Sequence, residues 1–120
     1  MENIDWQDLL LKFDGRINRA KFWIGIVAVW AITWLVFIIG GVVNSSIIWL
    51  LVFLVYLAAI WMGIAVSVKR WHDRGKSGWW VLIGLIPIVG PIWALIETGF
   101  LTGDSGDNQY GSDPLTPAAA

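Results

Sequence analysis

The sequence has no cysteine, one histidine and few charged residues. The absence of cysteine excludes disulfides, thiolate metal sites and cysteine nucleophiles. A single histidine, His72, cannot supply the several histidines of a His-Asp metal-dependent phosphohydrolase. Charged residues are 14% of the 120 residues and hydrophobic residues are 58%, whereas about a quarter of a typical soluble domain is charged. This composition predicts a single membrane domain.

Three apolar runs account for the hydrophobic excess. Residues 22–43 and 47–68 contain no charge, and neither do residues 79–96. A helix of 22 residues reaches roughly 33 Å, enough to cross a hydrocarbon core of roughly 30 Å. The third run is long enough if it continues past Glu97. We expect an all-α integral membrane protein with three transmembrane helices, at 22–43, 47–68 and 79–100.

The third run carries helix-breaking residues near its middle. Pro87 and Pro91 remove two helical hydrogen bonds, and Gly84 and Gly90 loosen the same turns. We expect a kinked third span. The alternative is a re-entrant hairpin, whose broken backbone would need shielding by protein or water.

All eight basic residues fall in two segments, one before the first run and one between the second and third. With three spans, both segments lie on the same face, and the positive-inside rule places that face in the cytoplasm. We therefore predict a cytoplasmic amino terminus and a periplasmic carboxyl terminus. A re-entrant third run would instead place the carboxyl-terminal tail inside.

The polar segments have distinct expected roles. Residues 1–21 combine apolar and polar side chains in a way typical of an interfacial amphipathic helix. Residues 69–78 form a basic loop, and residues 101–120 are expected to be a flexible polar tail. The tail lacks the acidic ladder of a calcium-binding loop, and we expect neither a metal nor a cofactor.

Aromatic and small residues indicate where the helices meet lipid and each other. Ten of the residues are tryptophan, and Trp23, Trp79 and Trp80 are expected to be interfacial anchors at span ends. Trp30 and Trp34 share one face in mid-span, a pattern typical of packing or lipid contact. Small residues that let helices approach closely recur every four positions, and we expect packing at Ala59, Gly63, Ser67, Gly90 and Ala94.

The stretch "VKRWHDRGKSGWW", residues 68–80, concentrates the polar chemistry of the chain. His72 and Asp73 could form an acid–base pair, and Ser77 could approach His72, but the sequence supplies no evident oxyanion hole. The alternative interpretation, a basic hinge at the membrane surface, requires neither an oxyanion hole nor a closed pocket. The candidates for headgroup or partner binding are Arg16, Arg19, Lys69, Arg70, His72, Asp73, Arg74 and Lys76.

Three blocks of the sequence resemble one known family. They are "FDGRINRAKFW", "KRWHDRGKSGWW" followed by "LIPIVG", and the tail "GDSGDNQYGSDP". In this order they closely resemble domain-of-unknown-function family 805, the YhaH-like small bacterial inner-membrane proteins. Family members commonly carry arginine where this chain has Gln109. The resemblance implies a bacterial inner-membrane location and brings no established activity.

Three hypotheses about function follow. The first is a non-enzymatic membrane component that self-associates or binds a membrane-protein partner, with its basic loops on anionic lipid and no role in nucleic-acid binding. The second is a transport role, for which Glu97 is the sole acid near a span, expected close to the interface opposite the basic segments. The third is an enzyme that acts on lipid headgroups through His72 and Asp73.

Overall fold

The computed structural model describes residues 5–115, and every regular element in that range is helical. The expected polar tail and amphipathic segment extend at either end into residues outside this range. The elements, in chain order, are α1 (Trp6–Leu11), α2 (Arg19–Val43), α3 (Ser46–Asp73), the 3₁₀ helix η1 (Gly78–Leu85), α4 (Val89–Ala94) and the π-helix η2 (Leu95–Phe100).

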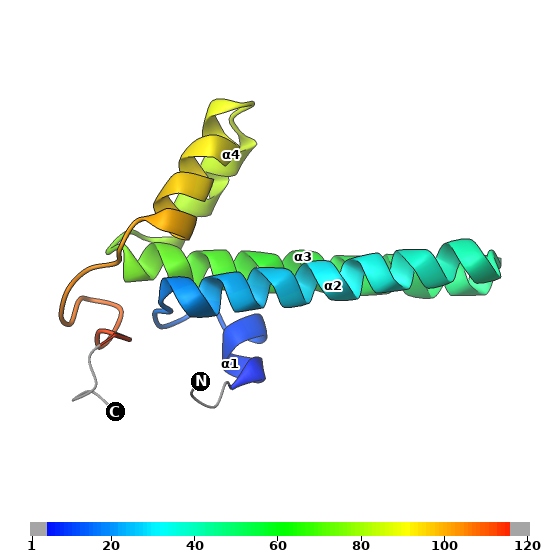
Figure 1. Cartoon of the computed structure of the whole chain (residues 1–120), viewed down its shortest axis with the longest axis horizontal. Helices are drawn as coiled ribbons and strands as arrows, with labels where there is room; N and C mark the ends of the chain where they lie inside the picture. Colours follow the sequence, from blue (N-terminus) through cyan, green and yellow to red (C-terminus); the bar gives the residue numbers. More distant parts are fainter. Residues whose placement is uncertain (1–4, 116–120) are drawn as a thin grey trace.

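Two long helices, α2 and α3, form an antiparallel hairpin that sets the long axis of the molecule (Figure 1). Asn44 closes α2 in the left-handed conformation, with its N–H donating to the Gly40 carbonyl, and the Ser45 hydroxyl caps α3. A Cβ on Gly40 would lie 3.0 Å from the Trp49 ring, and one on Gly25 would lie 3.0 Å from Val66. These glycines therefore set the close approach of the two helices. Both helices are long and apolar enough to cross a membrane.

The third apolar run does not form one long helix. It folds back on itself, with η1 leading outward and α4 and η2 returning (Figure 1). The tip is a tight turn in which the Val89 N–H donates to the Pro87 carbonyl at 2.7 Å and Ile88 takes a φ of +66°. A β-branched residue rarely adopts this conformation. We call residues 78–100 the short hairpin.

Both ends of the short hairpin lie at the same end of the α2–α3 hairpin. At the entry, the Trp80 ring stacks on Trp71 with centroids 5.7 Å apart. At the exit, the Gly99 carbonyl accepts a hydrogen bond from the Trp23 indole at 2.9 Å. The expectation of a third continuous spanning helix is therefore not confirmed. The physical reason lies in the interrupted helical bonding around Pro87 and Pro91, which lets the chain reverse.

The short helix α1 lies across α3 at this same end (Figure 1). Asp5 caps it by accepting from the Asp8 N–H, and Leu9 is buried against the long helices. The Lys69 ammonium donates to the carbonyls of Asp8 and Leu9, which the end of α1 leaves unpaired. The Trp61 indole donates to the Leu11 carbonyl. The amphipathic helix expected near the amino terminus is thus fixed to α3.

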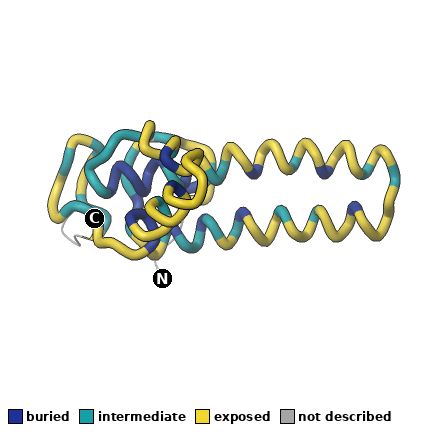
Figure 2. Tube along the Cα trace, turned by 90° about the horizontal axis from the view of Figure 1, so that it is seen from above, coloured by how far each residue is buried: buried dark blue, intermediate teal, exposed yellow. Residues whose placement is uncertain are grey.

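Buried residues gather where α1, the short hairpin and the carboxyl-terminal segment meet the long helices (Figure 2). A core of four residues lies there: Leu9, Ile17, Phe22 and Val66. Beyond it, most apolar side chains of α2 and α3 point outward and are exposed. Such a surface suits a hydrocarbon surrounding rather than water.

The small residues predicted to mediate helix packing lie in different settings within the chain. Ala59 is buried, and Gly90 packs inside the short hairpin against the Ile83 backbone. A Cβ added to Gly63 would meet open space. Close helix approach within the chain depends instead on Gly25 and Gly40.

The return of α4 against η1 predicts opposite effects for two glycines of the short hairpin. Gly90→Ala places a methyl group on the Ile83 carbonyl, whereas Gly84→Ala meets no neighbour within 4 Å. We expect Gly90→Ala to lower the free energy of unfolding of the detergent-solubilised protein by about 2 kcal/mol or more, measured by thermal denaturation. Gly84→Ala should be neutral or slightly stabilising. Equal, stabilising effects of both changes would indicate a continuous helix instead.

Candidate functional site

A buried carboxylate, Asp73, lies where three distant parts of the chain meet. It closes α3, and its Oδ1 accepts from Arg16 Nε at 3.1 Å and pairs with Arg16 Nη2 at 3.0 Å. Arg70, one turn earlier on α3, pairs with Oδ2. The side chains of Arg16, Arg70 and Asp73 are 1%, 0% and 4% exposed. We call these three residues and His72 the Asp73 cluster.

Arg16 also holds the carboxyl-terminal segment. Its guanidinium donates to the carbonyls of Asp104 at 2.6 Å, Gly106 at 2.7 Å and Gly111 at 3.2 Å. The Asp104 N–H donates in turn to the Asp73 carbonyl at 2.6 Å. The fixed fork of arginine donors suits this multiple contact. One side chain thereby joins the loop before α2, the end of α3 and the segment after η2.

The end of η2 is closed by donors from the long helices. Arg70 Nε donates to the Thr98 carbonyl at 2.6 Å, and its Nη2 donates to the Leu101 carbonyl. Arg19 Nη1 donates to the Phe100 carbonyl at 2.8 Å. Because a helix leaves its last carbonyls unpaired and partly negative, cationic donors are favourable there. Arg70 therefore serves both Asp73 and the end of the short hairpin.

His72 is covered by the carboxyl-terminal segment. Its Nδ1 lies 2.9 Å from the Gly15 carbonyl, so this nitrogen carries the hydrogen. The Tyr110 ring lies parallel to the imidazole, at an angle of 2° and a centroid distance of 3.9 Å. Asn108 Nδ2 donates to the His72 carbonyl and to Asp104 Oδ2. The stacked ring and the Gly15 contact leave His72 an enclosed side chain.

Glu97 forms a second buried contact beside the Asp73 cluster. Its carboxylate lies 2.5 Å from Lys76 Nζ and 3.4 Å from Arg74 Nε, and it accepts from the Trp93 indole at 2.9 Å. Glu97 thus lies beside the basic loop, and its expected place near the opposite interface is wrong.

The residues predicted to bind headgroups occupy very different environments. Lys69, Arg70, Arg16 and Asp73 are buried and bonded within the protein, which leaves them no surface for a lipid. Arg19 is exposed, and Arg74 and Lys76 are partly exposed. Trp79 is exposed and Trp80 stacks on Trp71, while Trp23 is bonded to Gly99. Headgroup contact stays a prediction for the exposed bases.

Several residues of this site were not among the sequence candidates. Asp104, Asn108 and Tyr110 close over the cluster, and all three lie in the third block of the family resemblance. The site also requires glycine at position 103, because a Cβ there would collide with Asp73. Gly75 plays the same part next to Asp104.

The arrangement holds three segments together: the loop before α2, the end of α3 and the segment after η2. Both oxygens of Asp73 are engaged by arginines, and the His72 ring is held by Gly15 and Tyr110. Within residues 5–115, no hydrogen bond joins Ser77 to His72 and no buried side-chain nitrogen or oxygen lacks a partner. The charged groups of Arg16, Arg70 and Asp73 are therefore satisfied by the protein itself.

Replacement of Arg16 should release the carboxyl-terminal segment. Arg16→Gln removes the contacts to Asp73 and to three carbonyls, and we expect a loss of about 3 kcal/mol or more in stability. Lys12→Gln removes the same charge from an exposed side chain whose ammonium group makes no hydrogen bond or ion pair with the described residues, and it should change stability little. Limited proteolysis checks this, because cleavage after residue 100 should be faster in Arg16→Gln than in Lys12→Gln. Equal resistance of both variants to cleavage would contradict the role of Arg16.

Comparison with known proteins places the chain in a family. Residues 10–112 match the family model described as "Protein of unknown function (DUF805)". The inner membrane protein YhaH of Escherichia coli is 31% identical over 126 residues, 92% of this chain and 97% of that protein. The inner membrane protein YhaI of Escherichia coli is 31% identical over 109 residues, 85% of each chain. No solved structure matches significantly. The chain therefore belongs to the DUF805 family, which includes inner membrane proteins of Escherichia coli.

Proposed function

We propose that this protein is a non-enzymatic component of the bacterial inner membrane that contacts anionic lipid headgroups at its cytoplasmic face and self-associates or binds a membrane partner. The observation that carries the proposal is the internal pairing of Arg16, Arg70 and Asp73, the three charged residues of the Asp73 cluster. Arg16 and Arg70 are bonded to Asp73 and to backbone carbonyls, and Tyr110 covers His72. A charged group that acts on a substrate would have to be free to reach it, and the charged groups of Arg16, Arg70 and Asp73 are already engaged.

The proposed orientation follows from the basic residues. Both basic segments and the carboxyl-terminal segment lie at one end of the α2–α3 hairpin, and the positive-inside rule favours the cytoplasm for that end. The short hairpin then enters the membrane and returns on the same side. Its backbone is shielded by its own helical bonds and by donors from Trp23 and Arg70. Both ends of the chain are cytoplasmic under this proposal.

Lipid contact is assigned to bases that the fold leaves available. Lys12 is exposed and Lys21 partly so, and neither ammonium group makes a hydrogen bond or ion pair with the described residues. Trp6 and Leu11 of α1 are also about half exposed, as expected of a helix lying in the interface. Each basic residue near an anionic leaflet contributes about 1 kcal/mol. Lys12 and Lys21 are thus the clearest candidates.

The lipid proposal predicts a selective loss of anionic lipid. We expect Lys12→Gln/Lys21→Gln protein, extracted mildly from membranes, to retain several-fold less phosphatidylglycerol than the wild type, with phosphatidylethanolamine unchanged. Ser105→Gln, an exposed change in the carboxyl-terminal segment, is the control. Lipid analysis of the purified proteins gives the readout. An unchanged ratio in the double variant would refute the assignment.

The orientation predicts a pattern of thiol accessibility. The chain has no cysteine, so Ser45→Cys and Ser112→Cys each provide a single thiol for an impermeant reagent. We expect Ser45→Cys to react in intact spheroplasts and Ser112→Cys to react only after lysis. Reaction of both from outside would mean that the short hairpin crosses the membrane and would reject the re-entrant arrangement.

A further inference from the structure

The described part of the molecule is broader at one end than at the other. We call the end that contains the Asp73 cluster the polar end. There, α1 and the short hairpin leave the long helices on opposite sides, whereas the other end consists of α2 and α3 alone (Figure 1). The tip of the short hairpin also stands away from the long helices, because α4 contacts η1 and η2 but neither α2 nor α3.

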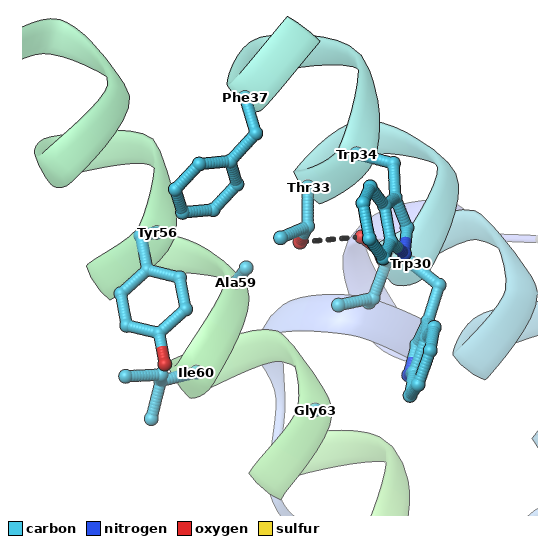
Figure 3. A pocket seen from close by; sticks show the side chains of 9 residues that line it. Trp30, Thr33, Trp34, Phe37, Tyr56, Ala59, Ile60 and Gly63 are labelled. Atoms are coloured by element: carbon cyan, nitrogen blue, oxygen red, sulfur yellow. Dashed lines mark hydrogen bonds between the residues drawn. The ribbon is translucent and has the colours of Figure 1, made fainter. Parts of the chain in front are cut away.

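The two long helices by themselves form a slender unit. Near their middle they leave an apolar groove of about 590 Å³, which residues of α2 and α3 alone line. Trp34 and Phe37 of α2 lie on one side of it and Tyr56 of α3 on the other (Figure 3). Acyl chains of the surrounding lipid are as apolar as these walls and fill such a groove in a membrane.

A second cleft separates the short hairpin from the long helices. It has a volume of about 470 Å³, with residues of α2 and α3 on one side and residues of the short hairpin on the other. Gly63 lines it from α3 and Gly84 from η1, and a Cβ on either would meet nothing within 4 Å. Beyond the contact of Trp80 with Trp71, the short hairpin therefore does not pack along α3. In a membrane it displaces lipid in addition to the lipid displaced by the long helices.

The exposed surface of the short hairpin suits hydrocarbon. Residues 79–96 contain no charge. Trp79, Leu85 and Ile88 are 79%, 78% and 78% exposed. Further exposed apolar side chains are Leu82, Ile86, Val89, Ile92, Trp93, Leu95, Ile96 and Phe100. Since so large an apolar surface is unfavourable in water, acyl chains are the occupant that the composition favours.

The short hairpin is long enough to enter one leaflet only. Its outward arm, η1, has eight residues, and a 3₁₀ helix rises about 2 Å per residue, which gives roughly 16 Å. One leaflet supplies half of a hydrocarbon core roughly 30 Å thick. The long helices have 25 and 28 residues, roughly 38 and 42 Å at about 1.5 Å per residue, and are long enough for both leaflets.

We infer that the protein is a wedge-shaped membrane inclusion whose polar end fits the convex leaflet of a curved membrane. The inference rests on the proposed re-entrant arrangement, and it concerns the shape of the lipid surface rather than its charge. Of the described elements, the leaflet at the polar end contains α2, α3 and both arms of the short hairpin, with α1 at its surface, whereas the other leaflet contains α2 and α3 alone.

Curvature lowers the cost of this unequal insertion. In a convex leaflet the headgroups are spread apart, so additional apolar volume enters with less compression of the lipid than in a flat leaflet. In a concave leaflet the headgroups are crowded, and the same volume costs more. The protein therefore concentrates where the leaflet at its polar end is convex and avoids membranes that bend the other way.

The test measures how the full chain, reconstituted in giant vesicles of phosphatidylethanolamine and phosphatidylglycerol, distributes into narrow membrane tubes pulled outward from them. The chain has no cysteine, so an impermeant thiol dye labels Ser112→Cys only in copies whose polar end faces outward. It labels Ser45→Cys only in copies of the opposite orientation. Relative to a lipid dye, we expect Ser112→Cys to be enriched in the tube about twofold or more and Ser45→Cys to be depleted there.

Two double variants test whether the short hairpin causes the enrichment. Leu85 and Ile88 lie at the tip of the short hairpin and are each 78% exposed, while Val42 and Ile47 beside the α2–α3 turn are 80% and 73% exposed. Leu85→Asp/Ile88→Asp withdraws the tip from hydrocarbon, because burial of two unpaired carboxylates is costly. With the label at Ser112→Cys, it should lose most of the enrichment. Val42→Asp/Ile47→Asp adds the same charges at the other end and should be enriched as the wild type is.

Three results would overturn the inference. They are an equal distribution of both labels between tube and vesicle, enrichment of both labels to the same degree, and unchanged enrichment in Leu85→Asp/Ile88→Asp. The comparison of the two orientations leaves the short hairpin unaltered, so it decides the question even if the tip variant does not fold. Thiol accessibility in spheroplasts tests the re-entrant arrangement separately. Opposite labelling there, together with equal distribution here, would refute the wedge alone.

Discussion

The structure depends on a carboxylate held between two arginines in a nearly water-free setting. Asp73 engages Arg16 and Arg70, whose side chains are almost completely buried. Two guanidinium groups leave one positive charge in excess, and burial of such a charge is costly unless its donors are satisfied. Here the remaining donors are taken by carbonyls of residues 98, 101, 104, 106 and 111. The cluster is therefore stable only when the carboxyl-terminal segment is folded over it.

This requirement explains why so many separate segments meet at one end. Arg16 comes from the loop before α2, Asp73 from the end of α3, and the carbonyls from beyond η2. Glycine is needed where the backbone passes close to the carboxylates, at Gly103 beside Asp73 and Gly75 beside Asp104. Away from this end, α2 and α3 meet only each other, and they come into close contact at Gly40, which packs against Trp49. The molecule thus has one polar end, where hydrogen bonds and ion pairs join several segments, and an apolar part formed by α2 and α3 alone.

The sequence predicts the two long helices well because each uncharged run fits the length of a span, and the family resemblance proved correct. It fails for residues 79–100, since an apolar run looks the same whether it crosses once or turns back at Pro87. It also hides the Asp73 cluster, because Arg16 and Asp73 are 57 positions apart. The sequence predicts a surface position for the basic residues because they are charged. The burial of Lys69 and Arg70 depends on carbonyl acceptors that only the folded chain brings near.

Hydrogen-bond donors are therefore satisfied to different degrees at the two ends of the long helices. At the polar end, the buried side-chain donors in the described range have acceptors, and water nearby could serve any that were exposed. At mid-depth, neither water nor lipid carbonyls can serve Trp30, Trp34 and Tyr56. Phenylalanine would supply the same apolar contact at these positions without an N–H or O–H to satisfy. The three side chains at mid-depth therefore carry donors that the described residues do not satisfy, in contrast to the buried donors of the polar end.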